Sequence, residues 1–149
     1  MEGENKRNID GFSYALGVVD AFNEVVRSGV KKLALAHPMR ERAQRDELAE
    51  AAREICRAYG TKLYLEDDPL LTDLFPVSLN KGTYNILFYG QEQVLETYLA
   101  LKQRKMELVA AGRYQGEQRR EVAKTFGQLL CYSEEAIERL IAQNQEKEL

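Results

Sequence analysis

The feature that most constrains this chain is a short run at residues 32–38, which reads Lys-Leu-Ala-Leu-Ala-His-Pro and ends on the only histidine in the sequence. The run is apolar on both of its faces, which is typical of a strand covered by helices on each side. Pro38 has no amide hydrogen to give to a strand ladder, but it is acceptable in the first turn of a helix. We therefore expect a buried strand over 32–36 that delivers His37 to the end of a sheet.

The same frame occurs twice in the chain. Apolar residues at spacings of three and four predict a helix over 10–28 that ends at Gly29, and a second helix that begins between 38 and 46 and ends at Gly60. Each glycine precedes the pattern Lys-Leu-x-Leu, and the two copies lie 30 residues apart. This offset matches one βα unit, and it favours parallel pairing of strands 32–36 and 62–66 with a right-handed crossover.

The rest of the chain predicts one more strand and then only helices. Four large apolar residues between Pro69 and Pro76 indicate a short helical turn that packs on the sheet, and 83–89 reads as the third strand. Residues 91–142 follow helical periodicity and predict a C-terminal group of three helices. We therefore expect a single α/β domain over 1–149, with a small, mainly parallel, three-stranded sheet (32–36, 62–66, 83–89) flanked by helices, and with mobile ends at 1–9 and 143–149.

Composition excludes several classes of protein. At 149 residues, with 44% apolar and 30% charged residues, the chain matches one globular domain with a full core. A net charge of −3 argues against a broad nucleic-acid footprint. Its apolar runs are too short for a membrane helix, and its first seven residues are polar, unlike a signal peptide, so we expect a cytoplasmic protein away from membranes. Cys56 and Cys131 are too far apart for a close-spaced metal or redox motif, and the cofactor is unknown from the sequence.

Polar residues follow the predicted strands where each strand ends. In open parallel sheets, ligands bind beyond the carboxyl ends of the strands. A parallel sheet would gather the candidate ligand-binding residues there: His37, Arg40, Asp68, Tyr89 and Gly90. A small anionic ligand is the first hypothesis, because a helix amino end and arginines follow His37. The alternative is a solvated helix with internal salt bridges, since the loop has no glycine-rich phosphate cradle.

The acidic run Glu66, Asp67 and Asp68 is a candidate divalent-metal site, because hard cations prefer clustered carboxylate oxygens. Adjacent residues at a strand end point in different directions, so at most two of the three could face one ion without a bend. The alternative is a polar turn before Pro69, with an acid capping the short helix that follows.

A small hydrolase or group-transfer enzyme is the second functional hypothesis, with or without a metal. His37 would act as general base with Asp67 or Asp68, because the unperturbed pKa of histidine lies near neutrality. The chain has no G-x-S-x-G nucleophile elbow, and a lone histidine is more commonly a structural residue. Whether the chain is an enzyme stays open on these grounds.

The back third carries a local excess of positive charge. Residues 102–124 hold seven basic residues against three acidic ones, and Tyr114 is the only aromatic residue among them. RNA is not favoured, because a single aromatic residue offers little base stacking. A helical surface for an acidic protein partner or for a homo-oligomer is the better hypothesis.

Overall fold

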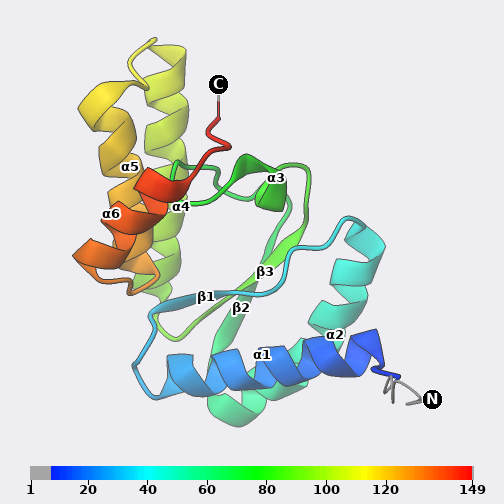
Figure 1. Cartoon of the computed structure of the whole chain (residues 1–149). Helices are drawn as coiled ribbons and strands as arrows, with labels where there is room; N and C mark the ends of the chain where they lie inside the picture. Colours follow the sequence, from blue (N-terminus) through cyan, green and yellow to red (C-terminus); the bar gives the residue numbers. More distant parts are fainter. Residues whose placement is uncertain (1–7, 149) are drawn as a thin grey trace, which may run out of the picture.

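The computed structural model describes residues 8–148, which form six helices around a three-stranded sheet (Figure 1). In chain order these elements are α1 (Gly11–Arg27), β1 (Leu33–Leu35), α2 (Arg42–Tyr59), β2 (Lys62–Glu66), α3 (Val77–Asn80), β3 (Asn85–Tyr89), α4 (Glu92–Ala110), α5 (Gly116–Leu129) and α6 (Glu134–Gln143). The predicted elements are therefore confirmed in type and order, except that the short helix follows Pro76 and does not include the four apolar residues before it.

Capping residues explain where several helices begin and end. Asp10 precedes α1, and its carboxylate accepts a hydrogen bond from the Ser13 amide at 3.3 Å. The Ser133 hydroxyl accepts from the Ala136 amide at 3.1 Å and caps α6. Gly60 ends α2 at a φ of 71°, a left-handed conformation that favours glycine.

The prediction of a mainly parallel sheet is wrong. The strand order is β1-β3-β2, and both pairs are antiparallel, with Tyr89 opposite Leu33 on one side and opposite Lys62 on the other. Strands β1 and β2 run in the same direction, but β3 lies between them. The long connection 67–84 turns back at the end of β2 and returns the chain in the opposite direction, so no crossover joins β2 to β3.

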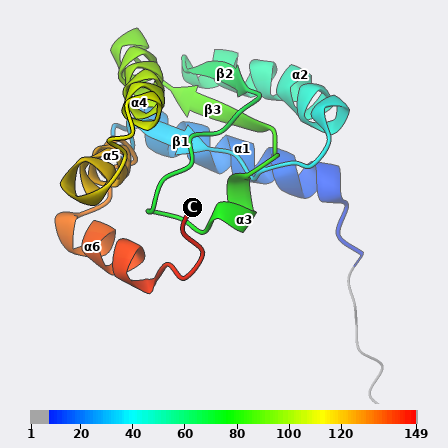
Figure 2. The ribbon, with the colours of Figure 1, turned by 90° about the horizontal axis from the view of Figure 1, so that it is seen from above.

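Helices cover both faces of the sheet, as the doubly apolar strand at 32–36 predicts. One core combines α1 and α2 with alternate sheet residues, among them Ala34, Ile86 and Phe88. The other core combines α4, α5 and α6 with the opposite sheet face, including Leu33, Leu87 and Tyr89. Figures 1 and 2 show these two helical layers on either side of the strands.

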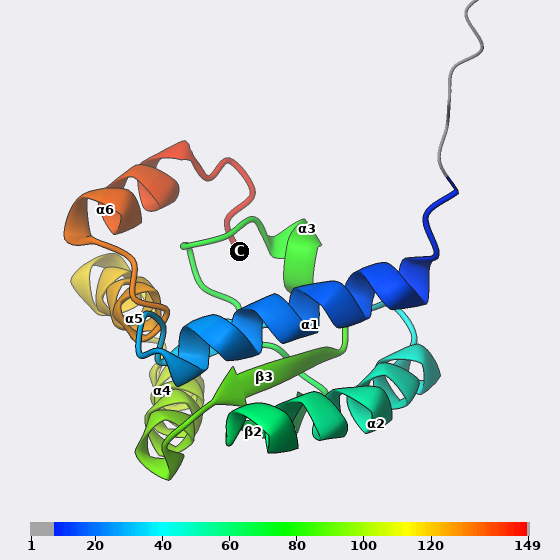
Figure 3. The same ribbon diagram turned by 90° about the horizontal axis from the view of Figure 1, so that it is seen from below.

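Residues 144–148 run back from α6 along the connection that contains α3, as Figures 2 and 3 show. The side-chain nitrogen of Asn144 donates to the carbonyl oxygens of Asp73 (3.0 Å) and Phe75 (3.1 Å). The Val77 amide donates to the Glu146 carbonyl at 3.0 Å. These contacts hold α3 in place beside the end of β1. Of the segments expected to be mobile, residues 1–7 and 149 lie outside the described residues.

Candidate functional site

A β-bulge places His37 at the end of β1. The Ala36 amide donates to the Ile86 carbonyl at 2.9 Å, and beyond it Met39 and Tyr84 exchange two hydrogen bonds of 2.9 and 2.7 Å. His37 and Pro38 therefore lie opposite the single residue Asn85, which is the two-against-one geometry of a bulge. A proline can occupy position 38 because no hydrogen bond of the bulge requires a backbone N–H donor there. The pairing of strands thus continues past Pro38, and α2 begins only at Arg42.

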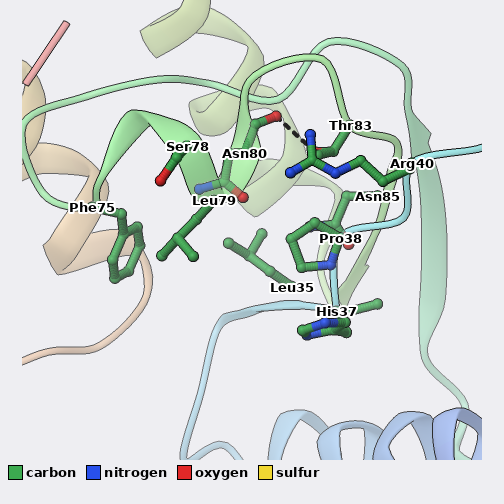
Figure 4. Close-up of a pocket in the computed structure, with 11 residues that line it drawn as sticks. Leu35, His37, Pro38, Arg40, Phe75, Ser78, Leu79, Asn80, Thr83 and Asn85 are labelled. Carbon is green, nitrogen blue, oxygen red and sulfur yellow. Dashed lines mark hydrogen bonds between the residues drawn. The ribbon is translucent and has the colours of Figure 1, made fainter. Parts of the chain in front are cut away.

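The bulge forms one wall of a pocket of about 480 Å³, and α3 with the residues around it forms the other. Figure 4 shows that the pocket has two chemically different ends. Phe75 and Leu79 lie at one end, and Arg40 lies at the other. The complete lining is Leu35, Ala36, His37, Pro38, Arg40, Phe75, Ser78, Leu79, Asn80, Thr83 and Asn85.

The polar lining of this pocket is basic or neutral, and none of its residues is acidic. Within residues 8–148, Arg40 and His37 form no salt bridge, so the Arg40 charge is not neutralised by a described side chain. Asn85 is 2% exposed, and its side-chain oxygen accepts from the Ile86 amide at 2.8 Å. Its side-chain nitrogen has no hydrogen-bond partner in the described part of the chain. The pocket therefore offers donors to an oxygen acceptor.

Arg45 holds together the ends of β2 and β3 beside Asn85. Its side chain is 1% exposed and donates to the carbonyl oxygens of Glu66 (2.8 Å) and Asn85 (3.0 Å), at the facing ends of β2 and β3. It also pairs with Asp46 at 2.8 Å and with Asp67. The hydrogen bond from Arg45 lowers the pKa of Asp67 below its usual value. Arg45 is thus a structural residue that fixes the sheet end from which Asn85 projects.

The acidic run at 66–68 is distributed among different partners. Glu66 is buried, and its carboxylate accepts from Tyr98 at 2.6 Å and from Lys102 at 2.9 and 3.0 Å. Burial, followed by the charge of Glu66, raises the pKa of Tyr98 far above its ordinary value. Asp67 pairs with Arg45, and the Asp68 carbonyl accepts from Lys102 at 2.7 Å. Among residues 8–148, no three acidic, histidine or cysteine side chains are arranged to hold a metal ion.

The expected cluster of ligand-binding residues is divided between two ends of the sheet. His37 and Arg40 share one pocket, but Tyr89 ends β3 and Gly90 follows it, and β3 runs the other way. The expectation that Tyr89 and Gly90 lie beside His37 depended on a parallel sheet, and it is wrong because the sheet is antiparallel. His37 and Asp67 leave the same end of the sheet from strands two spacings apart, about 10 Å. No hydrogen bond joins them in the described structure.

The basic residues of the back third are largely engaged within the molecule. Lys102 binds Glu66, Lys105 binds Glu148, and Arg119 binds Asp73. Arg120 and Lys124 both contact Glu138. The excess of positive charge in the sequence is therefore much smaller on the folded surface, which reduces the support for an acidic-partner surface there.

Sequence reasoning missed the α3 side of the pocket. Phe75, Ser78 and Asn80 come from the connection between β2 and β3, and Asn85 begins β3. All four lie about 40 to 50 residues after His37, and no local pattern joins them to it. The available signal was the set of apolar residues between Pro69 and Pro76, which a solvated loop would rarely carry. That signal indicated packing on the sheet, but it did not indicate which strand end would be covered.

The chain was compared with protein-family models, with curated proteins and with solved structures, and none of the three comparisons finds a match. Among residues 8–148, no helix is both long enough and apolar enough to cross a membrane.

Proposed function

We propose that this protein is a binding module whose ligand is a small carboxylate with an apolar body. The observation that carries the proposal is the polarity of the pocket beside the β1 bulge. It has an arginine and a buried asparagine on its polar side, an aromatic and aliphatic end, and no acidic lining residue. Its volume of about 480 Å³ lies within the range of small-molecule sites.

Each end of the pocket has a distinct role in the proposal. Arg40 would bind the carboxylate, because a guanidinium fork matches the two oxygens of that group. The Asn85 side-chain nitrogen can donate a further hydrogen bond to the same oxygens, whereas the Ser78 hydroxyl already donates to the Glu146 carboxylate. Phe75 and Leu79 would cover the apolar body of the ligand and remove it from water.

The experiment compares hexanoate with hexylammonium, which has an apolar body of similar length and the opposite charge. We expect hexanoate to raise the melting temperature and to give a saturable heat in calorimetry, and we expect no effect from hexylammonium. Arg40→Gln should weaken hexanoate binding by about 10- to 100-fold, which corresponds to one charge-assisted hydrogen-bonded contact. Arg42→Gln removes the same charge two residues later, outside the pocket lining, and should change binding by less than about 2-fold.

Equal binding of hexanoate and hexylammonium, or equal loss in the two variants, would contradict a carboxylate site at Arg40. The hydrolase hypothesis has less support than this one, because Asp67 is paired with Arg45 and does not contact His37. It would gain support if His37→Ala abolished hydrolysis of an ester or phosphoester while hexanoate binding persisted.

A further inference from the structure

A second pocket lies at the other end of the sheet, where β3 ends and where β1 and β2 begin. Its volume is about 400 Å³. The pocket is lined by three cationic residues: Arg27 at the end of α1, and Lys31 and Lys32 before β1. The glycines of three neighbouring turns, Gly29, Gly60 and Gly90, complete this part of the lining. This pocket is separated from the His37 pocket by the length of the strands, and the two share no lining residue.

The lining of this second pocket holds three cations and no acidic residue. Within residues 8–148, none of the three forms a salt bridge. The Arg27 guanidinium donates to the Tyr59 carbonyl at 2.6 Å, which fixes it at the pocket rim and leaves most of its donors available. Glu92, which begins the next helix, is engaged by Lys62 at 2.9 Å.

Lys31 is the most informative of these cations. It is partly buried, and its ammonium group lies 5.4 Å from the centre of the Tyr132 ring, without a carboxylate partner in the described residues. Burial lowers the pKa of Lys31. Tyr132 lies outside the pocket lining, so an anion in the pocket would stabilise this partly desolvated ammonium group once the Lys31 side chain turns away from the ring, because the anion replaces part of the lost hydration.

The backbone around this pocket also favours an anionic ligand. Gly29 and Gly60 adopt left-handed φ values of 83° and 71°, and the absence of side chains there leaves the pocket open. Gln91, which also lines the pocket, precedes α4 without capping it through its side chain. The first amides of α4 therefore have no side-chain acceptor from the N-cap residue and lie beside a cationic pocket.

We propose that this pocket binds the phosphate group of a small phosphorylated molecule. Three cationic residues line this one pocket, which matches a dianion better than the single charge of a carboxylate, for which one arginine suffices. The volume of about 400 Å³ suits a small molecule, and the chain as a whole carries a net charge of −3, which disfavours an extended polyanion. This site is independent of the carboxylate pocket at Arg40.

The test uses pyrophosphate and inorganic phosphate as probes, in calorimetry at an ionic strength held constant with sodium chloride. We expect saturable binding of pyrophosphate, and we expect the double variant Lys31→Gln/Lys32→Gln to weaken it at least tenfold. The matched control is Lys81→Gln/Arg104→Gln, which removes the same net charge from two exposed side chains outside the pocket. This control should change binding by less than about 2-fold, because exposed charges at a distance are screened by salt.

Amide resonances identify where the probe binds. Pyrophosphate should move the resonances of Gly29, Gly60 and Gly90 and leave those of Ser78 and Asn80 in place. The proposal is overturned if 10 mM pyrophosphate gives no binding, if the two double variants lose affinity equally, or if the moved resonances lie in the His37 pocket. Circular dichroism of the variants shows whether a loss of binding reflects a loss of fold, and single Lys31→Gln and Lys32→Gln variants then replace a double variant that fails to fold.

Discussion

Replacing the buried Arg45 with methionine should cost far more stability than the same change at the exposed Arg42. Both arginines contact Asp67, but their side chains are 1% and 63% exposed. Arg45 alone also donates to the carbonyl oxygens of Glu66 and Asn85, which lie in residues that are each 2% exposed. The pair of variants therefore separates the value of a buried guanidinium from that of its salt bridge.

The magnitude follows from the two carbonyl groups. A buried acceptor that loses its donor costs about 1–3 kcal/mol. The apolar methionine side chain packs in the same space and offsets part of that cost. We expect a net loss of about 3 kcal/mol for Arg45→Met, or about 6–12 °C in the melting temperature for a domain of this size. Arg42→Met should change the free energy of unfolding by less than about 1 kcal/mol, because the pair it removes is half exposed.

Urea unfolding followed by circular dichroism measures both variants, with the free energy of unfolding taken from a linear extrapolation. Arg45→Lys provides an intermediate case if the methionine variant does not fold, because it keeps the charge but loses the fork that reaches two carbonyls. A loss below about 1 kcal/mol for Arg45→Met, or equal losses for Arg45→Met and Arg42→Met, would refute the assignment of Arg45 as the residue that joins the ends of β2 and β3.

Two further predictions test the packing and the pH dependence of the fold. Gly127→Ala should destabilise the protein by about 1–2 kcal/mol in urea unfolding, because its new methyl group would lie 2.6 Å from an Ile137 side-chain carbon. The control Gly17→Ala places its methyl group where no atom lies within 4 Å, and it should raise the free energy of unfolding by a few tenths to 1 kcal/mol through helix propensity. Equal effects of the two changes would contradict the α5–α6 packing. Asp67→Asn should lower the free energy of unfolding at pH 7 by less than about 1 kcal/mol, and this difference should vanish in acid. The hydrogen bond from Arg45 lowers the pKa of Asp67 in the folded state. The stability that the ion pair provides is therefore present above the unfolded pKa of about 3.9 and is lost as the pH falls through the folded pKa. A difference that grows in acid would contradict the ion pair.

The local structure of this chain could be predicted from its sequence, because the signals act over a few residues. The spacing of apolar residues sets each helix, and Ser133 and Gly60 mark helix ends through contacts within one turn. The pairing of strands could not be predicted in the same way. The repeat of Lys-Leu-x-Leu predicts parallel pairing of β1 with β2, and this is wrong, because β3 enters between them and pairs with both in the antiparallel sense.

For the candidate site too, local features could be predicted from the sequence and long-range ones could not. His37 and Arg40 lie in one pocket because they are only three positions apart in the chain, at the bulge that ends β1. Tyr89 and Gly90 lie at the far end because their position depends on the direction of β3, and that direction depends on the connection 67–84. Lys31 and Lys32 went unnoticed as a site because the two turns that complete their pocket, at Gly60 and Gly90, come later in the chain.

The central functional claim is that the pocket beside the β1 bulge binds a small carboxylate. The most direct measurement is a titration of isotopically labelled protein with hexanoate, followed through backbone amide resonances. We predict saturable shifts that cluster at 36–40 and at 78–85, and that are lost in Arg40→Gln but kept in Arg42→Gln. Shifts that are absent, that do not saturate, or that cluster at Gly29, Gly60 and Gly90 would contradict the claim.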